Sequence, residues 1–187
     1  MVRQLVPGAQ HNTTHSQSVT VLKGRYGWLS TFLREWQAFQ PGHPGATRSS
    51  RPVVNLAWYD ACSYVDWLRI ETDDRNWRLP TEEEWEYACR AGTLTSYSWG
   101  NSIRGNNARY DIAGGTTTVG KYAPNRGGFH DMHGNLREWV SDWWHFYSGE
   151  PVTDPEGEGS GNGKINRGSS WQDDEKKGRS AHRGGFD

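Results

Sequence analysis

The segment from Asp131 to Trp144, DMHGNLREWVSDWW, gathers carboxylates, a Gly-Asn pair and three tryptophans in a short stretch of chain. Ca²⁺ takes roughly six to eight hard oxygen ligands, and a Gly-Asn turn lets backbone carbonyls converge beside carboxylates. The same carboxylates could instead cap turns by accepting hydrogen bonds from backbone N–H groups. The neighbouring His130 and His133 suit softer metals, and no Cys/His set at metal-ligand spacing accompanies them. The segment is therefore either a calcium loop or an ordinary turn.

Residues that could carry out nucleophilic catalysis lie near the C-terminal end of the sequence. Ser169 and Ser170 stand beside Trp171, and His182 follows them in the chain. A serine becomes a nucleophile only where the fold brings a base within hydrogen-bonding distance, and sequence alone does not place these residues together. We therefore assign no catalytic residue.

Three consecutive glutamates, Glu82–Glu84, could supply paired carboxylates for acid–base chemistry. They directly follow Thr81, however, and Thr81 with Glu84 forms a capping box at the start of a helix. Negative charge in a first turn also stabilises the helix dipole, so we interpret all three as helix-capping residues. We expect this helix to stop at Gly92. Its expected inner face consists of Trp85, Ala88 and Cys89.

The remaining elements follow from hydrophobic spacing. Apolar residues at helical intervals predict helices over residues 26–39 and 58–70, and a short strand is expected over residues 19–22. Beyond Gly92, short runs between glycines and asparagines indicate short strands and long ordered loops. The buried face expected for the helix over 58–70 consists of Ala61, Tyr64, Val65 and Leu68.

The bulk properties exclude several kinds of partner. The chain has 187 residues, with Lys+Arg 21, Asp+Glu 22 and a formal net charge of -1. This length suits one domain, which we expect over residues 1–187, and the balanced charge does not call for nucleic acid or an anionic membrane surface. No segment has the roughly 18 apolar residues of a membrane span, and the N-terminus has no signal-peptide apolar region. We expect a soluble protein and leave its compartment open.

Large aromatic side chains must build the core. Hydrophobic residues make up only 33% of the chain, yet it contains Trp 11, Tyr 8 and Phe 5. Each of these rings buries a large area while its polar atom seeks a hydrogen-bond partner. Cys62 and Cys89 could form a disulfide, but two small buried thiols are the interpretation that we favour.

Six motifs follow one another along the chain: PVVNLAWYDACSYVDWL, RLPTEEEWEYACRAG, YSWGN, NARYD, TTTVGKYAPNRGGFHDMHGNLREWVSDWW and RGSSW...GRSAHRGGF. In this order they resemble the formylglycine-generating-enzyme family, also called the sulfatase-modifying-factor family, and the resemblance is strongest over residues 51–187. It implies an α+β, C-type-lectin-like fold, with helices flanking a small twisted antiparallel sheet and many ordered loops. Family members usually continue to a final strand with a GFR motif, whereas this sequence ends at Phe186-Asp187. We therefore expect the closing strand to be missing from this chain or to come from elsewhere.

The resemblance also implies two structural calcium loops. The first is DMHGNLREW and the second is NARYDIAG, which is shorter here than in calcium-binding relatives. The implied ligands of the first loop are the side chains of Asp131 and Glu138 and the carbonyls of Gly134 and Leu136. Those of the second are the side chains of Asn107 and Asp111 and the carbonyls of Ala108 and Ala113.

Oxidase members of the family use two cysteines after a GGSW motif to hold copper and activate oxygen on a substrate thiol. In the corresponding run, RGSSWQDDEKKGRSAHR, Asp173 stands at the position of the first cysteine and no cysteine follows. A thiolate binds soft Cu(I), and a carboxylate cannot replace it. We therefore expect no copper and no oxidase chemistry, which argues against an enzyme.

Another branch with this domain comprises the variable proteins of diversity-generating retroelements, in which targeted mutagenesis alters C-terminal side chains while the scaffold persists. The chain is similar to them in its small size, in lacking the oxidase cysteines and in its RGSSW...GRSAHRGGF region. We predict a ligand-binding domain whose ligand is a protein or a cell-surface molecule. The predicted binding face consists of Trp143, Trp144, Trp171, Asp173, Asp174, Lys176 and His182.

Two alternatives stay open. One is an enzyme or maturation factor of the family with a non-copper mechanism, and the other is a calcium-stabilised structural domain. An enzyme would show a concave pocket with convergent polar groups and a residue of shifted pKa. A binding domain would show an exposed face around Trp171.

Overall fold

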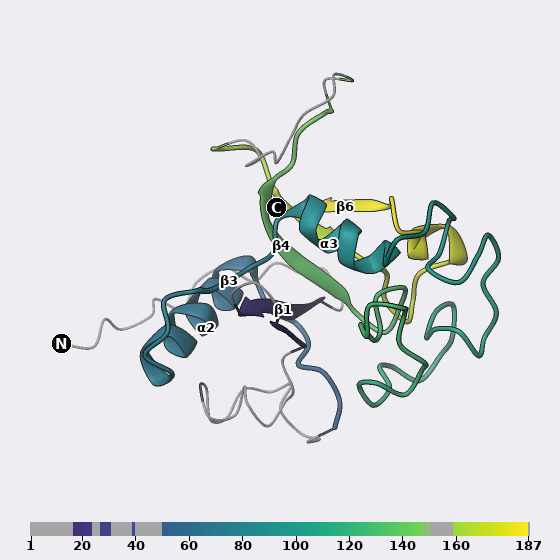
Figure 1. Ribbon diagram of the computed structural model, residues 1–187, viewed down its shortest axis with the longest axis horizontal. Coiled ribbons are helices and arrows are strands. Elements are labelled where there is room, and N and C mark those ends of the chain that lie inside the picture. Colours follow the sequence, from purple (N-terminus) through teal and green to yellow (C-terminus); the bar gives the residue numbers. More distant parts are fainter. Residues whose placement is uncertain are drawn as a thin grey trace.

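The computed structural model describes residues 17–23, 27–30, 39, 50–147, 149 and 159–186. Within this part of the chain, a six-stranded sheet has the order β2-β1-β4-β5-β6, and β3 pairs with β1 beside that path (Figure 1). The described strands are β1 Gln17–Lys23, β2 Gly27–Ser30, β3 Trp77–Arg78, β4 Arg137–Trp143, β5 Lys164–Arg167 and β6 Arg183–Phe186. The described helices include α2 Trp58–Glu71, α3 Glu82–Arg90 and the short 3-10 helix η1 Glu175–Gly178. The architecture is α+β, as predicted.

Strand β4 lies at the centre of the sheet. It pairs antiparallel with β5, and β5 pairs antiparallel with β6. On its other side β4 pairs with β1, and this pairing is parallel, with Val19 opposite Trp139. The described pairings are therefore antiparallel, as predicted, except for this one parallel pair. A parallel pair needs a long crossover, and the connection from β1 to β4 is long because it includes both α2 and α3.

The last described residues of the chain form an edge strand. β6 pairs with β5 over the whole length of both strands, with Arg183 opposite Arg167 and Phe186 opposite Lys164. From the absence of the GFR motif, we expected the closing strand to be missing from this chain or to come from elsewhere. In the structure, the segment RGGF supplies a strand at this edge.

Both helices predicted after residue 50 are confirmed. The buried residues of α2 are Ala61, Tyr64, Val65 and Leu68, the four that the spacing predicted. In α3 the hydroxyl of Thr81 accepts a hydrogen bond from Glu84 N (3.2 Å), and Glu84 Oε2 accepts one from Thr81 N (2.9 Å). The capping box is therefore present, and α3 ends at left-handed Ala91, followed by Gly92 at φ 84°.

The prediction over residues 19–39 is confirmed only in part. The expected strand over residues 19–22 lies within β1. The expected helix over residues 26–39 is wrong at residues 27–30, which form β2 and pair with β1, Ser30 lying opposite Thr20. The spacing of Trp28 and Leu29 suits a helix, but pairing with a neighbouring strand overrides such a local pattern. Residues 31–38 lie outside the described part of the chain.

The core lies on both faces of β4. Consecutive strand residues point to opposite faces of a sheet. Trp139 belongs to a buried cluster with α2, Trp77 and Leu79. Its neighbour Val140 belongs to a second buried cluster with the inner face of α3. The two helices therefore cover opposite faces of this strand, and together they fix its orientation.

Residues 91–136, all described by the structure, contain no helix or strand beyond one isolated bridge, Tyr97 to Gly100. Side chains order this stretch instead. The Asn125 amide donates to the carbonyls of Ala88 (2.7 Å) and Cys89 (3.1 Å) at the end of α3, and its Oδ1 accepts from the Gly127 amide. The stretch matches the long ordered loops that the sequence predicted.

Cys62 and Cys89 are free thiols, as predicted. Cys89 is fully buried, whereas Cys62 is half-buried on α2. Burial raises the pKa of Cys62 to about 11 and that of Cys89 to about 12. Both thiols are therefore protonated at neutral pH, which suits the packing role that we favoured.

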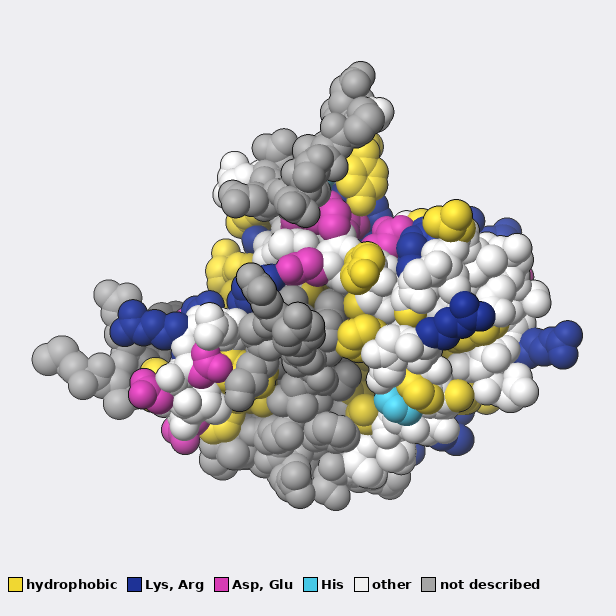
Figure 2. All heavy atoms as spheres, in the orientation of Figure 1, with side chains coloured by type: hydrophobic (Ala, Val, Ile, Leu, Met, Phe, Trp, Pro, Cys, Tyr) yellow, Lys and Arg dark blue, Asp and Glu magenta, His cyan; other side chains and the backbone are white. Residues whose placement is uncertain are grey.

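The surface carries mixed charge. On the face shown in Figure 2, basic and acidic side chains are interspersed with hydrophobic and neutral ones. This pattern agrees with the nearly balanced charge of the sequence. Among the described residues, no helix has both the length and the apolar composition needed to cross a membrane.

Candidate functional site

The loop between β5 and β6, residues 168–182, carries five of the seven predicted binding residues. It leaves the sheet at Gly168, whose φ of 75° is in the left-handed region that favours glycine. A Cβ at this position would lie 3.3 Å from Trp85 Cζ2, so the ring of Trp85 packs directly against the backbone. The loop then runs through η1 and returns to the sheet at β6. We call residues 168–182 the C-terminal loop.

Asp173 is the buried anchor of the C-terminal loop. Its carboxylate accepts two hydrogen bonds from Arg137 of β4, at 2.8 Å from Nε and 2.5 Å from Nη2. It also accepts from the amide (2.8 Å) and hydroxyl (2.9 Å) of Ser170, and Lys177 Nζ lies 3.2 Å away. Burial would raise the pKa of Asp173, but these hydrogen bonds outweigh it and hold the pKa well below its usual range. Asp173 was predicted on an exposed binding face, and the structure places it in the interior instead.

A second buried ionic network joins the base of the C-terminal loop to α3. Arg183 of β6 donates to both carboxylate oxygens of Glu82, at 2.6 and 2.7 Å. The fully buried Arg167 of β5 lies 3.6 Å from Glu82 and also pairs with Glu86. Charges removed from water persist only when they are paired and hydrogen-bonded in this way. Glu82 therefore has a tertiary role beyond the helix-capping role assigned from sequence.

The exposed part of the C-terminal loop is polar and carries both signs of charge. Asp174 and Lys176 are exposed, and Trp171 is half-buried. Asp174 caps η1, since its Oδ1 accepts from Lys177 N at 3.2 Å. Trp171 is held by its backbone, which donates to Asn135 O (3.0 Å). These side chains can contact a ligand while the backbone beneath them stays fixed.

His182 closes the same face. Its side chain is half-buried, and its Nδ1 has no hydrogen-bond partner among the described residues. Burial lowers the pKa of His182, and the nearby guanidiniums of Arg137 and Arg167 lower it further. The imidazole is therefore neutral near pH 7, with its Nδ1 buried beneath the surface of the loop.

Trp143 and Trp144 lie at the other end of β4. Trp143 lies six positions after Arg137, the residue that holds Asp173. In an extended strand this spacing corresponds to a distance of about 20 Å. The rings of both tryptophans stack on cations, Lys164 Nζ at 3.9 Å from Trp143 and the Arg183 guanidinium at 4.7 Å from Trp144. The seven predicted residues therefore do not form one face.

The hydroxyls of Ser169 and Ser170 are engaged away from His182. The hydroxyl of Ser169 donates to His133 O at 2.8 Å, and that of Ser170 donates to Asp173. Both serines are buried. These contacts give the two serines a structural role, which is to hold the C-terminal loop in place.

The predicted calcium ligands are distributed unevenly in the structure. Asp131 and Gly134 of the first loop and Asn107 and Ala108 of the second line one small cavity of about 10 Å³, close to the space of one water. Asp131 Oδ1 is buried there without a hydrogen-bond partner among the described residues, while its Oδ2 accepts from Gly120 N at 2.8 Å. An orphaned carboxylate oxygen beside a small cavity fits a cation. Calcium near Asp131 stays a prediction.

The other four predicted ligands do not line this cavity. Glu138 Oε2 accepts a hydrogen bond from Trp85 Nε1 at 2.6 Å in the core, and Leu136 O faces Gly168. Ala113 O accepts from the Arg109 guanidinium at 3.1 Å, and Asp111 is exposed. Because Arg109 already places a positive charge at the Ala113 carbonyl, the second predicted loop does not fit a separate divalent cation.

The chain matches a known domain family over most of its length. The profile of the Sulfatase-modifying factor enzyme 1-like domain matches residues 9–187. Formylglycine-generating enzyme of Mus musculus is 32% identical over 164 residues, covering 77% of this chain and 42% of the mouse protein. Serine/threonine-protein kinase pkn1 of Chlamydia pneumoniae is 36% identical over 149 residues, covering 77% of this chain and 22% of that protein. The chain thus spans less than half the length of these relatives.

Solved structures support the same fold. Treponema denticola variable protein 1 superimposes with a TM-score of 0.77 at 24% identity, covering 92% of this chain and 87% of that one. PvdO from Pseudomonas aeruginosa superimposes with a TM-score of 0.67 at 26% identity, covering 90% of this chain and 66% of that one. The predicted fold and the predicted family are both confirmed. The chain belongs to the sulfatase-modifying-factor, or formylglycine-generating-enzyme, family.

Proposed function

We propose that this chain is a non-oxidase, ligand-binding member of its family that recognises a protein through the exposed part of the C-terminal loop. The observation that carries the proposal is the state of Asp173. Resemblance to the oxidases aligns this position with their first copper-binding cysteine. Here it is a carboxylate that is buried and saturated by Arg137 and Ser170. The position that would bind the metal thus fixes the loop instead.

The arrangement around Asp173 suits recognition. A rigid buried anchor holds the loop's backbone, while Trp171, Asp174 and Lys176 project from its outer side. Aromatic residues are enriched at protein-binding surfaces, and polar residues commonly form the rim around them. Trp143 and Trp144, about 20 Å away along β4, form a separate surface and not an extension of this one.

The superposition with Treponema denticola variable protein 1 supports the further proposal that the loop is diversified between gene copies. The structure indicates which positions of the loop could vary between copies and which could not. Asp174 and Lys176 are exposed and Trp171 is half-buried, so substitutions at these positions leave the buried ion pairs of the loop in place. Asp173, Arg137 and Arg167 must stay, because loss of one partner leaves a buried charge unpaired.

Sibling copies of the gene from one source test this proposal. We expect nucleotide changes to concentrate at the codons of Trp171, Asp174, Lys176 and His182. The codons of Asp173 and Arg137 should stay fixed, and they serve as the internal control. Changes spread evenly along the chain, or changes at Asp173 as frequent as those at Asp174, would overturn the diversified face.

An enzymatic role without copper is the second candidate. It is favoured by the 32% identity with mouse formylglycine-generating enzyme. The assay is oxygen consumption with a cysteine-containing peptide, with and without Cu(I). We expect no rate above the protein-free control, because Cys62 and Cys89 lie on α2 and α3 and not in the C-terminal loop. Turnover without added copper would replace the binding proposal by this candidate, and copper-dependent turnover would overturn the non-oxidase assignment itself.

A further inference from the structure

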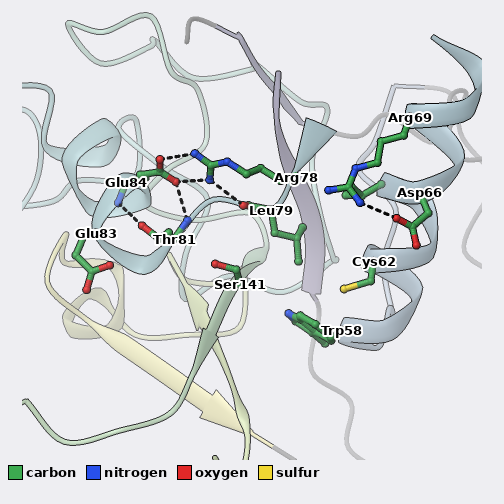
Figure 3. A pocket seen from close by; sticks show the side chains of 11 residues that line it. Trp58, Cys62, Asp66, Arg69, Arg78, Leu79, Thr81, Glu83, Glu84 and Ser141 are labelled. Carbon is green, nitrogen blue, oxygen red and sulfur yellow. Dashed lines mark hydrogen bonds and ion pairs between the residues drawn. The ribbon is translucent and has the colours of Figure 1, made fainter. Parts of the chain in front are cut away.

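A cleft of about 590 Å³ lies between α2, the start of α3 and β4. Its volume is within the range of about 300–1,000 Å³ typical of small-ligand sites. Trp58, Cys62 and Val65 line it from one side of α2, and Glu83 lies on the opposite wall, at the start of α3 (Figure 3). The cleft shares no lining residue with the C-terminal loop, so a ligand bound in it would be independent of the proposed function.

The charges that line the cleft do not cancel. Asp66 pairs with Arg69 at 2.8 Å, and Glu84 pairs with Arg78 at 2.6 Å. These four groups neutralise one another, and Glu83 is the remaining charged residue of the lining. Counted over the lining residues alone, the formal charges therefore leave one carboxylate, that of Glu83, without a counter-charge.

Glu83 also lacks a partner for one oxygen. Its Oε2 is buried and has no hydrogen bond to any described residue. Asp142 Oδ1 is likewise buried without a hydrogen-bond partner among the described residues. Burial raises the pKa of Glu83, and the neighbouring carboxylates of Asp142 and Glu82 raise it further. A buried acceptor without a donor costs free energy, and a positively charged donor entering the cleft would relieve that cost.

The rest of the lining suits an apolar stem. Trp58, Val65 and Leu79 contribute aromatic and aliphatic surface to the cleft. The nearby ammonium of Lys164 is already engaged. It donates to Ser141 O at 2.7 Å and lies 4.0 Å from the Trp58 ring, and it is not part of the lining. These two contacts hold the Lys164 ammonium beside the cleft and outside its lining.

We propose that this cleft binds an alkylammonium group, either a free amine or a lysine side chain of a peptide. The ammonium donates to Glu83, and the apolar stem packs along Trp58, Val65 and Leu79. Binding of an anionic ligand is disfavoured, because the anion would face the carboxylate of Glu83.

Cys62 provides an internal reporter for the test. Its sulfur points into the cleft (Figure 3), whereas Cys89 is 0% exposed and serves as the unreactive control thiol. The folded protein is treated with methyl methanethiosulfonate, and mass spectrometry gives the rate of modification at each cysteine. The probes are pentylamine, pentanol and pentanoate, which share a stem and differ in charge. We expect pentylamine to slow modification of Cys62 several-fold, and pentanol and pentanoate to have little effect.

Variants and peptides complete the test. Glu83→Gln should abolish protection by pentylamine, and Glu71→Gln, an exposed site at the end of α2, should retain it. Protection by capped Ala-Lys-Ala, but not by its Nε-acetylated form, would identify a lysine side chain as the ligand, and protection by pentylamine alone would identify a free amine. Equal protection by pentanol and pentylamine, protection that survives Glu83→Gln, or no protection by any probe would overturn the proposal.

Discussion

Arg137 and Asp173 form a two-pronged ion pair in the interior, with side chains only 7% and 6% exposed. Arg137 begins β4, and Asp173 lies in the C-terminal loop, 36 residues further along the chain. The pair therefore ties the loop to the centre of the sheet. Two parallel hydrogen bonds also fix its geometry more strictly than a single contact would.

Removing the charge of Asp173 should destabilise the fold. Asp173→Asn leaves Arg137 buried without its counter-charge, and such losses cost about 3–5 kcal/mol. Asp174→Asn is the matched control, because Asn caps a helix about as well as Asp and the side chain is exposed. Urea unfolding followed by circular dichroism measures both. Equal stability of the two variants would show that the ion pair contributes little.

Acid should weaken the fold through His133. Ser98 N donates to its Nε2 at 3.1 Å, so the proton sits on Nδ1 and is donated to Gly178 O at 2.8 Å. Burial lowers the pKa of His133 to about 4. A lowered pKa gives stability that is present above the unfolded pKa of about 6.5 and is lost as the pH falls towards 4, by up to about 3 kcal/mol.

The titration of His133 can be followed directly by NMR in the native protein. His133→Gln should flatten the stability profile between pH 6.5 and pH 4. A native-state midpoint near 6.5 for His133 would contradict this prediction even if the variant folds poorly.

Gly168 should resist substitution. Its φ of 75° strains any residue with a Cβ, and the added methyl would crowd Trp85 at 3.3 Å. Gly168→Ala should therefore cost about 1–3 kcal/mol of unfolding free energy. The control is Gly159→Ala, where a Cβ meets no atom within 4 Å. Thermal unfolding compares the two, and a Gly168→Ala protein as stable as the control would show that the turn tolerates a side chain.

Calcium should stabilise the protein through Asp131. Its orphaned Oδ1 lies beside the cavity that Gly134, Asn107 and Ala108 also line. A ligand that binds only the folded state raises the Tm. We expect millimolar Ca²⁺ to raise the Tm over that in EDTA for the wild type and for Asp111→Asn, but not for Asp131→Asn. An equal shift in all three, or none in the wild type, would remove calcium from this site.

The sequence by itself determined the family, the α+β class and the helices α2 and α3. Those helices depend on local information, namely the apolar spacing of α2 and the reciprocal hydrogen bonds of Thr81 and Glu84 in α3. The free state of both thiols also followed from residue type. The helix expected at residues 27–30 was wrong because strand pairing with β1, a non-local interaction, overrode the local pattern.

Only the tertiary structure decided which polar residues are available to a ligand. Asp173 and Asp174 are neighbours of the same type, yet one is buried by Arg137 and the other is exposed. Trp143 and Trp171 were predicted on one binding face, but Trp143 ends β4 whereas Trp171 lies in the C-terminal loop, which Asp173 ties to the start of β4. Glu82 and Glu83 are adjacent, and only Glu82 meets Arg183, 101 residues away. The physical reason is common to all three cases: burial and ion pairing depend on partners distant in sequence, and no local pattern encodes their positions.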